Sequence, residues 1–366
     1  MKKRKKPIIK LTEKGGLIMY NEWMKELTQI IGVSGDEKRV SRYLAKAYQG
    51  QCDKIVYDNL GSVFALKKSK KENAKRVMVC AHMDEVGLMI TEIQENGLLS
   101  FIKIGPIEEK ALYGSRVRIQ TREKELIGVI VANEDAIKNN DVKGMRIDIG
   151  AASKEEVKTQ GIMAGDTAVL AGEYTALHQN RIMAKAADAR QGCVLGLALL
   201  QALKDVELDF DLYVGASVME EVGQRGGTTA TGLIHPDLGI VLDGGAAGDY
   251  KGKDNEVGQL GKGVLIRYYD KGMMPNRGLL LELETVCKEN KIDSQYYYTM
   301  TLTDSAWVHK LFSGCPTLTL GVCTRNSHTG NVEIDMHDLD CAKKALVEIV
   351  KGLNEEKIQK FKEYNR

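Results

Sequence analysis

The sequence predicts an α/β fold in which helices sandwich a mixed sheet and a small all-β unit is inserted. Three observations support this prediction. Nearly continuous apolar runs, typical of strands buried on both faces of a sheet, occur at 76–81, 212–218 and 238–242. Amphipathic helical patterns alternate with these runs. Between 88 and 178, helical periodicity is scarce and short β-like segments follow one another.

The 366 residues favour about two domains. We expect an α/β domain built from 20–87 and 179–366, and an inserted β domain at 88–178. The first domain opens with apolar residues at helical spacing, a turn at 32–36 and a second helix around 40–48. Its later helices are expected at 192–203, 278–289 and 336–353. Its strands are expected at 55–57, 63–66, 76–81, 212–218, 238–242, 264–268, 296–301 and 317–320, and those of the insertion at 88–93, 98–104, 116–119, 126–132 and 167–170.

The first 19 residues are expected to be a non-native or disordered extension. The start is basic, but no apolar stretch follows that would make it an export signal. Codons for Lys14-Gly15-Gly16 can form a bacterial ribosome-binding site shortly before Met19. We therefore expect Met19 to be the native start, which mass spectrometry of the native protein would test.

Composition excludes several classes of partner. Lys plus Arg (52) and Asp plus Glu (50) nearly cancel, which argues against nucleic acid and against an anionic membrane. No apolar run approaches the length of a membrane span. The seven cysteines are odd in number and lack a CxxC pair, so neither a disulfide framework nor a thiolate zinc site is indicated. We expect a cytoplasmic protein that acts on small molecules or peptides.

Adjacent carboxylates Glu220 and Glu221 follow the apolar run at 212–218 and precede a glycine-rich turn. Successive side chains on a strand point to opposite faces, so both acids can serve one site only where the strand stops and the backbone turns. One could then bind a metal ion while the other moves protons. The alternative is a pair of solvated acids that open a loop.

Other candidate ligands lie at comparable positions. His82 and Asp84 follow the strand at 76–81, where the carboxylate can orient a metal-bound imidazole. Asp188 precedes an expected helix and could be only its N-cap, Asp243 could belong to an Asp-Gly turn, and His328 could be a loop residue. With Asp84 set aside as the acid that orients His82, these residues supply two histidines, three carboxylates (Asp188, Asp243 and one of the Glu220–Glu221 pair) and one extra acid, which is the stoichiometry of a two-metal hydrolase. We expect His178, His235, His309 and His337 to be structural.

From about residue 20 to the C-terminus, the chain resembles the di-metal glutamyl, deblocking or tetrahedral (TET-type) aminopeptidases, some of which are labelled cellulase M or endoglucanase. Five segments carry the resemblance: Ile31-Gly32-Val33-Ser34-Gly35, Asp58-Asn59-Leu60-Gly61, Ala81-His82-Met83-Asp84-Glu85-Val86-Gly87, Glu220-Glu221-Val222-Gly223, and Thr324-Arg325 followed by His328.

The resemblance implies a zinc-peptidase-like fold whose inserted barrel or PDZ-like domain makes dimer contacts on the way to a dodecamer. It implies two divalent ions, Zn²⁺ or Co²⁺, one held by His82, Asp188 and Asp243 and the other by Asp188, Glu221 and His328. Glu220 would be the general base, and Asp84 would orient His82. The expected activity is hydrolysis of N-terminal residues from peptides.

The chain departs from the family pattern at several positions. Ala189 stands where an Asp is usual, Cys323 where a Pro is usual and Asn326 where a Tyr is usual, and Thr301-Leu302 replaces glycines. These departures bear on specificity and metal affinity. Two alternatives stay open: a related di-metal amidohydrolase that deacylates amino acids, and a catalytically weak scaffold whose β insertion builds an oligomer. The cellulase label gains no support, because only 6% of residues are aromatic and no sugar platform is evident.

Overall fold

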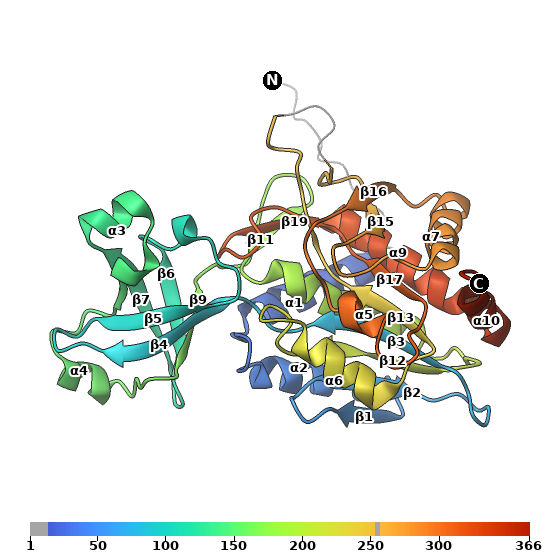
Figure 1. Cartoon of the computed structure of the whole chain (residues 1–366), viewed down its shortest axis with the longest axis horizontal. Helices are drawn as coiled ribbons and strands as arrows, with labels where there is room; N and C mark the ends of the chain where they lie inside the picture. Colours follow the sequence, from blue (N-terminus) through green and yellow to red (C-terminus); the bar gives the residue numbers. More distant parts are fainter. Residues whose placement is uncertain (1–13, 253–256) are drawn as a thin grey trace, which may run out of the picture.

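The computed structural model describes residues 14–252 and 257–366. Two parts are evident (Figure 1): a larger α/β body, and a β-barrel that projects from it and carries the labels β4 to β7 and β9. The mixed α/β fold and the small barrel expected from the sequence are thus confirmed. An extension was expected at 1–19. Residues 1–13 lie outside the described residues, and helix α1 begins at Lys14.

A six-stranded sheet forms the centre of the α/β body. Its strands follow the order β1-β2-β12-β3-β13-β17, and β12, β3, β13 and β17 run parallel. In register, Ser217 lies opposite His82 and Leu242 opposite Ala81, so the carboxyl ends of three strands meet at one edge. The strands are β1 (Lys54–Tyr57), β2 (Val63–Lys67), β3 (Arg76–His82), β12 (Asp211–Ser217), β13 (Leu238–Leu242) and β17 (Thr317–Leu320).

Helices cover both faces of this sheet, as the apolar strand sequences require. Along β3, Val77, Val79 and Ala81 pack into the larger core, whereas Met78 and Cys80 pack into a smaller core on the opposite face. The larger core contains residues of α2 (Lys38–Tyr48), α5 (Ala187–Ala202), α7 (Arg277–Glu289), α9 (Met336–Gly352) and α10 (Glu355–Glu363), with α1 (Lys14–Gln29) beside α5. The smaller core contains residues of α6 (Arg225–Ile234) and α8 (Ser305–Val308).

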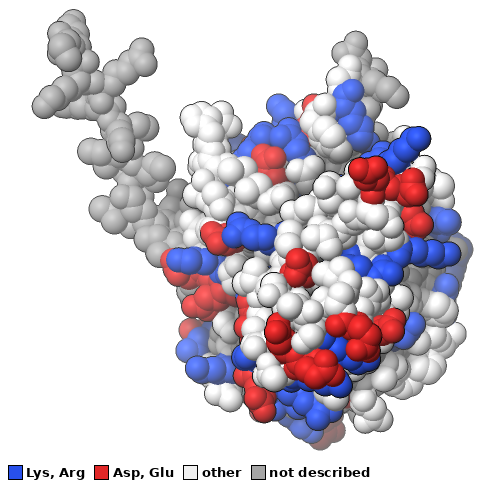
Figure 2. Space-filling view, turned by 90° about the vertical axis from the view of Figure 1, so that its left-hand side faces the viewer, with Lys and Arg blue, Asp and Glu red and all other residues white. Residues whose placement is uncertain are grey.

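The barrel closes in the order β4-β5-β8-β7-β6-β9 around an apolar interior. It also contains two short α-helices and two 3₁₀ helices, so the expectation of an all-β insertion is wrong in that detail. Seen from the barrel side, acidic and basic side chains are interspersed rather than separated by sign (Figure 2). Its elements are β4 (Gly87–Ile93), β5 (Leu99–Ile104), η1 (Glu109–Ala111), β6 (Arg116–Gln120), β7 (Glu125–Ala132), α3 (Glu134–Asn139), η2 (Val142–Gly144), β8 (Met145–Asp148), α4 (Lys154–Thr159) and β9 (Thr167–Leu170).

Three small sheets complete the body. The first consists of β10 (Thr175–Ala176), β11 (Arg181–Ala184) and β19 (Val332–Asp335), the second of β14 (Gly245–Ala246) and β18 (Cys323–Thr324), and the third of β15 (Val264–Tyr269) and β16 (Ser294–Tyr298). No helix in the described part of the chain is both long and apolar enough to cross a membrane.

Helix α5 begins at Ala187, five residues before the expected start at 192. Asp188 therefore lies in the first turn of the helix instead of preceding it, and the N-cap position belongs to Ala186. The helix is buried almost all round, so it has no polar face to mark its beginning in the sequence. Gly192 allows the helix to approach β13, because a Cβ atom there would lie 2.7 Å from the Leu242 carbonyl oxygen.

Candidate active site

Six of the seven expected site residues line a cavity of about 480 Å³ at the carboxyl edge of β3, β12 and β13, and the seventh, Asp84, lies buried beside His82. The barrel contributes to its wall through Pro106, and Met300 and Leu302 form an apolar rim. The polar lining includes His82, Asp188, Glu220, Glu221, Gln224, Asp243, Lys271, Thr301, Thr303, Ser327 and His328. The cavity therefore contains the candidate catalytic and metal-binding side chains, as expected at strand ends of an α/β sheet.

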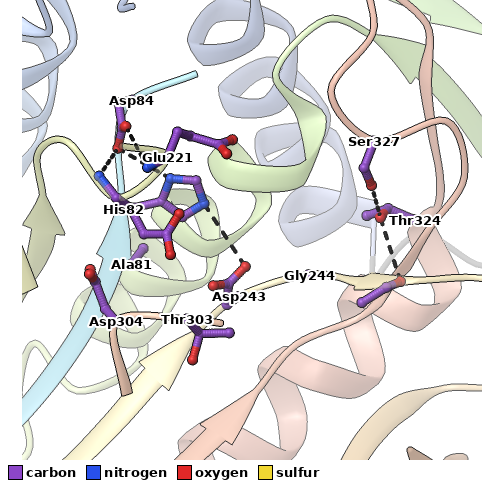
Figure 3. Close-up of polar contacts among 12 residues, drawn as sticks. Ala81, His82, Asp84, Glu221, Asp243, Gly244, Thr303, Asp304, Thr324 and Ser327 are labelled. Carbon is purple, nitrogen blue, oxygen red and sulfur yellow. Dashed lines mark hydrogen bonds and ion pairs between the residues drawn. The ribbon is translucent and has the colours of Figure 1, made fainter. Parts of the chain in front are cut away.

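The buried His82 ring lies between two carboxylates (Figure 3). Its Nδ1 atom is 3.3 Å from Asp84 Oδ1, and its Nε2 atom is 3.9 Å from Asp243 Oδ1. Burial lowers the pKa of His82, but the hydrogen bond with Asp84 and the surrounding acids outweigh this effect and raise it well above the usual value. Asp84 is therefore placed to fix the ring and leave Nε2 facing the cavity.

The turn after β12 is organised by two carboxylates from elsewhere in the chain. Asp84 accepts hydrogen bonds from the backbone N–H groups of Glu220 (3.0 Å) and Glu221 (3.1 Å). Glu37 accepts one from Met219 N–H (3.0 Å). Met219 has a φ of +54°, which is unfavourable for a side chain of its size, so these bonds hold a strained backbone that aims both acids into the cavity.

Glu220 is 6% exposed, and Gln224 Nε2 donates to its Oε1 atom at 3.1 Å. Burial raises the pKa of Glu220 well above the usual value for a carboxyl group, and the charges of Asp243, Asp304 and Glu221 act in the same direction. Burial thus makes Glu220 a stronger proton acceptor than an exposed carboxylate, which suits a group that exchanges protons.

Glu221 and His328 form a second histidine–carboxylate pair, with His328 Nε2 3.2 Å from Glu221 Oε2. His328 has a φ of +63°, and Ser327 and Thr324 are joined by a hydrogen bond of 2.6 Å beneath this loop. Burial lowers the pKa of His328, but Glu221 outweighs that effect and raises it to about 9.

Asp188 lies beside both pairs: its charge raises the pKa of Asp243 on one side and that of His328 on the other. Its Oδ1 atom is buried and has no hydrogen-bond partner. Gly244 makes room for this carboxylate, since a Cβ atom there would lie 1.7 Å from Asp188 Oδ1. The expectation that Asp188 could be only an N-cap is therefore wrong, because its side chain caps no helix.

The donor set fits divalent cations. Burial of neighbouring carboxylates is costly, and here it raises the pKa of Asp243 to about 6. Asp188 Oδ1 is a buried oxygen without a hydrogen-bond partner, next to the His82–Asp243 and Glu221–His328 pairs. A carboxylate that bridged two metal ions would occupy such a position. His, Asp and Glu donors in these numbers suit Zn²⁺ or a similar ion.

A buried ion cluster lies behind the site. Glu85 Oε1 is 2.6 Å from Lys185 Nζ and 3.4 Å from Arg190 Nη2, and it accepts the Gly32 N–H at 3.2 Å. One carboxylate thus serves two buried cations. Backbone carbonyls of Leu27 and Ile30 accept their remaining hydrogen bonds, so the cluster ties helix α1 to the site.

Sequence reasoning missed three residues that contact this centre. Glu37 accepts a hydrogen bond from the turn after β12, and Gln224 donates one to Glu220. The buried Asp304 accepts a hydrogen bond from Ser217. Burial raises the pKa of Asp304 to about 7. Gln224 could have been predicted from its position four residues after Glu220. Asp304 lies two residues after Thr301-Leu302, where the chain departs from the family pattern. Nothing in the sequence distinguished Glu37 from a surface acid before a helix.

Comparisons with known proteins identify the family and its relatives. A family model described as M42 glutamyl aminopeptidase matches residues 61–345. The chain is 33% identical over 352 residues to the glutamyl aminopeptidase of Lactococcus lactis subsp. cremoris, covering 93% of this chain and 98% of that one.

Two solved structures are similar over nearly the whole fold. A TET aminopeptidase from Thaumarchaeota archaeon SCGC AB-539-E09 is 30% identical with a TM-score of 0.89, covering 94% of this chain and 99% of that one. A TET1 peptidase from Pyrococcus horikoshii, described as able to assemble into a tetrahedron or a large octahedral shell, is 29% identical with a TM-score of 0.79, covering 91% and 100%.

Proposed function

This chain belongs to the M42 glutamyl aminopeptidase family, and on that premise we propose that it removes N-terminal residues from peptides with the help of two divalent ions, Zn²⁺ or Co²⁺. The observation that carries the proposal is the partnerless Asp188 Oδ1 between the His82–Asp243 and Glu221–His328 pairs. His82, Asp188 and Asp243 would hold one ion, and Asp188, Glu221 and His328 the other. Ions bound there supply Lewis acidity to the scissile carbonyl and to water.

Glu220 acts as the general base in this proposal. Its buried carboxylate accepts a proton from the attacking water and then delivers it to the leaving amine. Gln224 holds the carboxylate from one side, and Asp84 fixes the backbone that presents it. Asp84 also orients His82, so a single buried side chain positions both a ligand and the base.

We propose that the N-terminal residue removed has an acidic side chain. Lys271 is the sole Lys or Arg among its lining residues, and its exposed side chain stands beside the apolar rim of Met300 and Leu302. A substrate carboxylate reaching this rim would find an opposite charge there. The relative from Lactococcus lactis, named a glutamyl aminopeptidase, is consistent with this preference.

We further propose that the protein works in the cytoplasm as a homo-oligomer built from dimers. All seven cysteines are free, which suits a reducing compartment. The barrel would supply dimer contacts, and the dodecamer described for another similar solved structure supports the same assembly here. Two exposed apolar side chains on its surface, Ile102 and Ile127, are each more than half exposed and would be covered in such a contact.

The alternative function is that of a related amidohydrolase that deacylates amino acids, which would bind two metal ions with the same kinds of side chain. Release from aminoacyl anilides and from N-acyl amino-acid anilides separates the two reactions. We expect activity only on substrates with a free α-amine, because the buried acids of the site suit a cationic amine. Faster release from N-acyl substrates would replace the aminopeptidase proposal by the deacylase.

Replacing Glu220 with Gln tests the mechanism. We expect kcat to fall by about 10²–10⁴-fold, the usual contribution of a general base, while metal analysis finds the same ion content as in the wild type. Glu289→Gln, at the exposed end of α7, is the matched control and should be fully active. Full activity of the Glu220 variant would reject the assignment.

A further inference from the structure

A second group of metal-binding side chains lies away from the active site. Asp293, His337 and Cys341 bring a carboxylate oxygen, an imidazole nitrogen and a thiol sulfur within 4.8 Å of one another. In the described part of the chain, no other three or more His, Cys, Asp and Glu side chains converge to that limit. The active-site donors are spread wider, as two pairs around Asp188.

The three donor atoms are spaced as ligands of one ion would be. His337 Nε2 is 2.9 Å from Asp293 Oδ2 and 3.6 Å from Cys341 Sγ. Zinc–ligand bonds of about 2.0–2.3 Å in a tetrahedron place neighbouring donors roughly 3.3–3.8 Å apart. The two histidine distances lie within a few tenths of an ångström of this range, and the donor atoms of Asp293 and Cys341 lie within 4.8 Å of each other. Both contacts of the histidine also involve the same ring nitrogen, which faces the centre of the group.

The backbone holds these donors in place. His337 and Cys341 are one turn apart on α9, so their side chains lie on the same face of the helix. Asp293 precedes β16, and its carbonyl oxygen accepts the Val264 N–H at 3.0 Å. An ion bound by all three would therefore join the start of α9 to the segment that leads into β16.

Access and charge both favour a cation. The side chains of Asp293 and His337 are 69% and 41% exposed, which leaves a path for an ion and a position for water. Cys341 is buried, and the charges of Asp293, Asp340 and Asp338 surround its sulfur. Negative charges at this spot oppose a bare thiolate and stabilise a bound cation.

We propose that Asp293, His337 and Cys341 bind one divalent ion of the Zn²⁺ type, with water as the fourth ligand. This site is independent of the active site, shares no residue with it and differs from it in containing a thiolate. Binding releases the thiol proton to solvent and clamps α9 to the edge of β16. In this proposal His337, expected from the sequence to be structural, acts as a metal ligand.

Titration of the whole protein with Co²⁺ tests the proposal, because a thiolate ligand gives a thiolate-to-cobalt charge-transfer band that His and carboxylate ligands do not give. We expect the wild type to show this band and to bind about one ion per chain more than the Cys341→Ser variant, which loses the band. Because Cys341 lies in the core, the surface variant His337→Gln provides a second test and should also lose the band.

His178→Gln is the matched control, since His178 is exposed and belongs to neither site. It should keep the band and the full ion content. Zn²⁺ should also raise the Tm of the wild type and this control more than that of His337→Gln. An identical band and ion content in wild type, Cys341→Ser and His337→Gln would overturn the proposal and leave His337–Asp293 as a surface pair over a core cysteine.

Discussion

The α/β body and the barrel differ in the number of ionisable side chains that they bury. Between residues 87 and 170, all of which are described, no ionisable side chain is buried, and the buried polar residues are Thr121 and Thr167. Among its described residues, the body buries thirteen Asp, Glu, His, Lys and Arg residues: Glu37, His82, Asp84, Glu85, Lys185, Arg190, Glu220, Asp243, Arg267, Asp270, Asp304, Asp335 and Asp338.

The contrast suggests that the body carries the reacting groups and that the barrel is a structural part. Buried charges are costly unless they are paired, so they are retained where they position reacting groups. The barrel is held by apolar packing and reaches the site through the loop after β5, where a Cβ atom on Gly105 would lie 3.3 Å from Glu221 Cβ. Its core should therefore affect stability, whereas the buried charges of the body should affect both stability and catalysis.

The largest effect is expected from Glu85→Gln. Removing the carboxylate leaves Lys185 and Arg190 buried without their shared anion, which should lower the free energy of unfolding by about 3–5 kcal/mol. Urea unfolding measures the change. Glu207→Gln is the matched control, because Glu207 pairs with Lys70 on the surface, where solvent screens the pair and its loss should change the stability far less. Equal costs for the two variants would contradict the role of the buried cluster.

Ile147→Ala tests the apolar character of the barrel. Ile147 is fully buried, so its truncation should lower the free energy of unfolding by about 2–5 kcal/mol. We expect kcat to be unchanged at temperatures where circular dichroism reports a folded protein. Ile240→Ala, fully buried in β13 of the body, should cost a similar free energy and also lower kcat. Loss of kcat in the folded barrel variant would break the separation between the two parts.

Asp84→Asn addresses the buried charges around the site. The amide would keep the volume but lose the charge that orients His82 and accepts the N–H groups of Glu220 and Glu221. We expect metal affinity or kcat to fall about 10–100-fold, measured by metal titration and anilide hydrolysis. Glu348→Gln, on the exposed side of α9, should leave both unchanged. A variant at position 84 with wild-type affinity and turnover would remove Asp84 from the mechanism.

The smallest effect is expected from Lys271→Ala at the exposed rim. An ion pair in that position contributes about 1 kcal/mol, so kcat/KM for glutamyl anilide should fall roughly fivefold, with leucyl anilide unaffected. Lys288→Ala, in the last turn of α7, controls for a general loss of positive charge. A parallel loss on both substrates would show that Lys271 does not select the side chain.

Much of the fold could be predicted because its strands are buried on both faces. The expected limits of the strands at 238–242 and 317–320 agree with the structure, since Asp237 and Asp243 bound the first and Pro316 and Gly321 the second. The strand expected at 296–301 lies at 294–298 instead, because Tyr-rich segments with exposed side chains carry a weak pattern. Helix α6 was missed because its sequence, Arg-Gly-Gly-Thr-Thr-Ala-Thr-Gly-Leu-Ile, is poor in helix-forming residues.

The sequence by itself determined which residues follow the buried strands, and from this it predicted His82, Asp84, Glu220, Glu221 and Asp243 as neighbours at one edge. That prediction was possible because parallel strands align their carboxyl ends. The motifs also identified the family, which the family model confirms. Only the tertiary structure decided that Asp188 lies inside a helix between two histidine–carboxylate pairs and that Glu37 holds Met219. It alone brought Asp293 beside His337, because contacts between residues 44 positions apart depend on packing that no local pattern encodes.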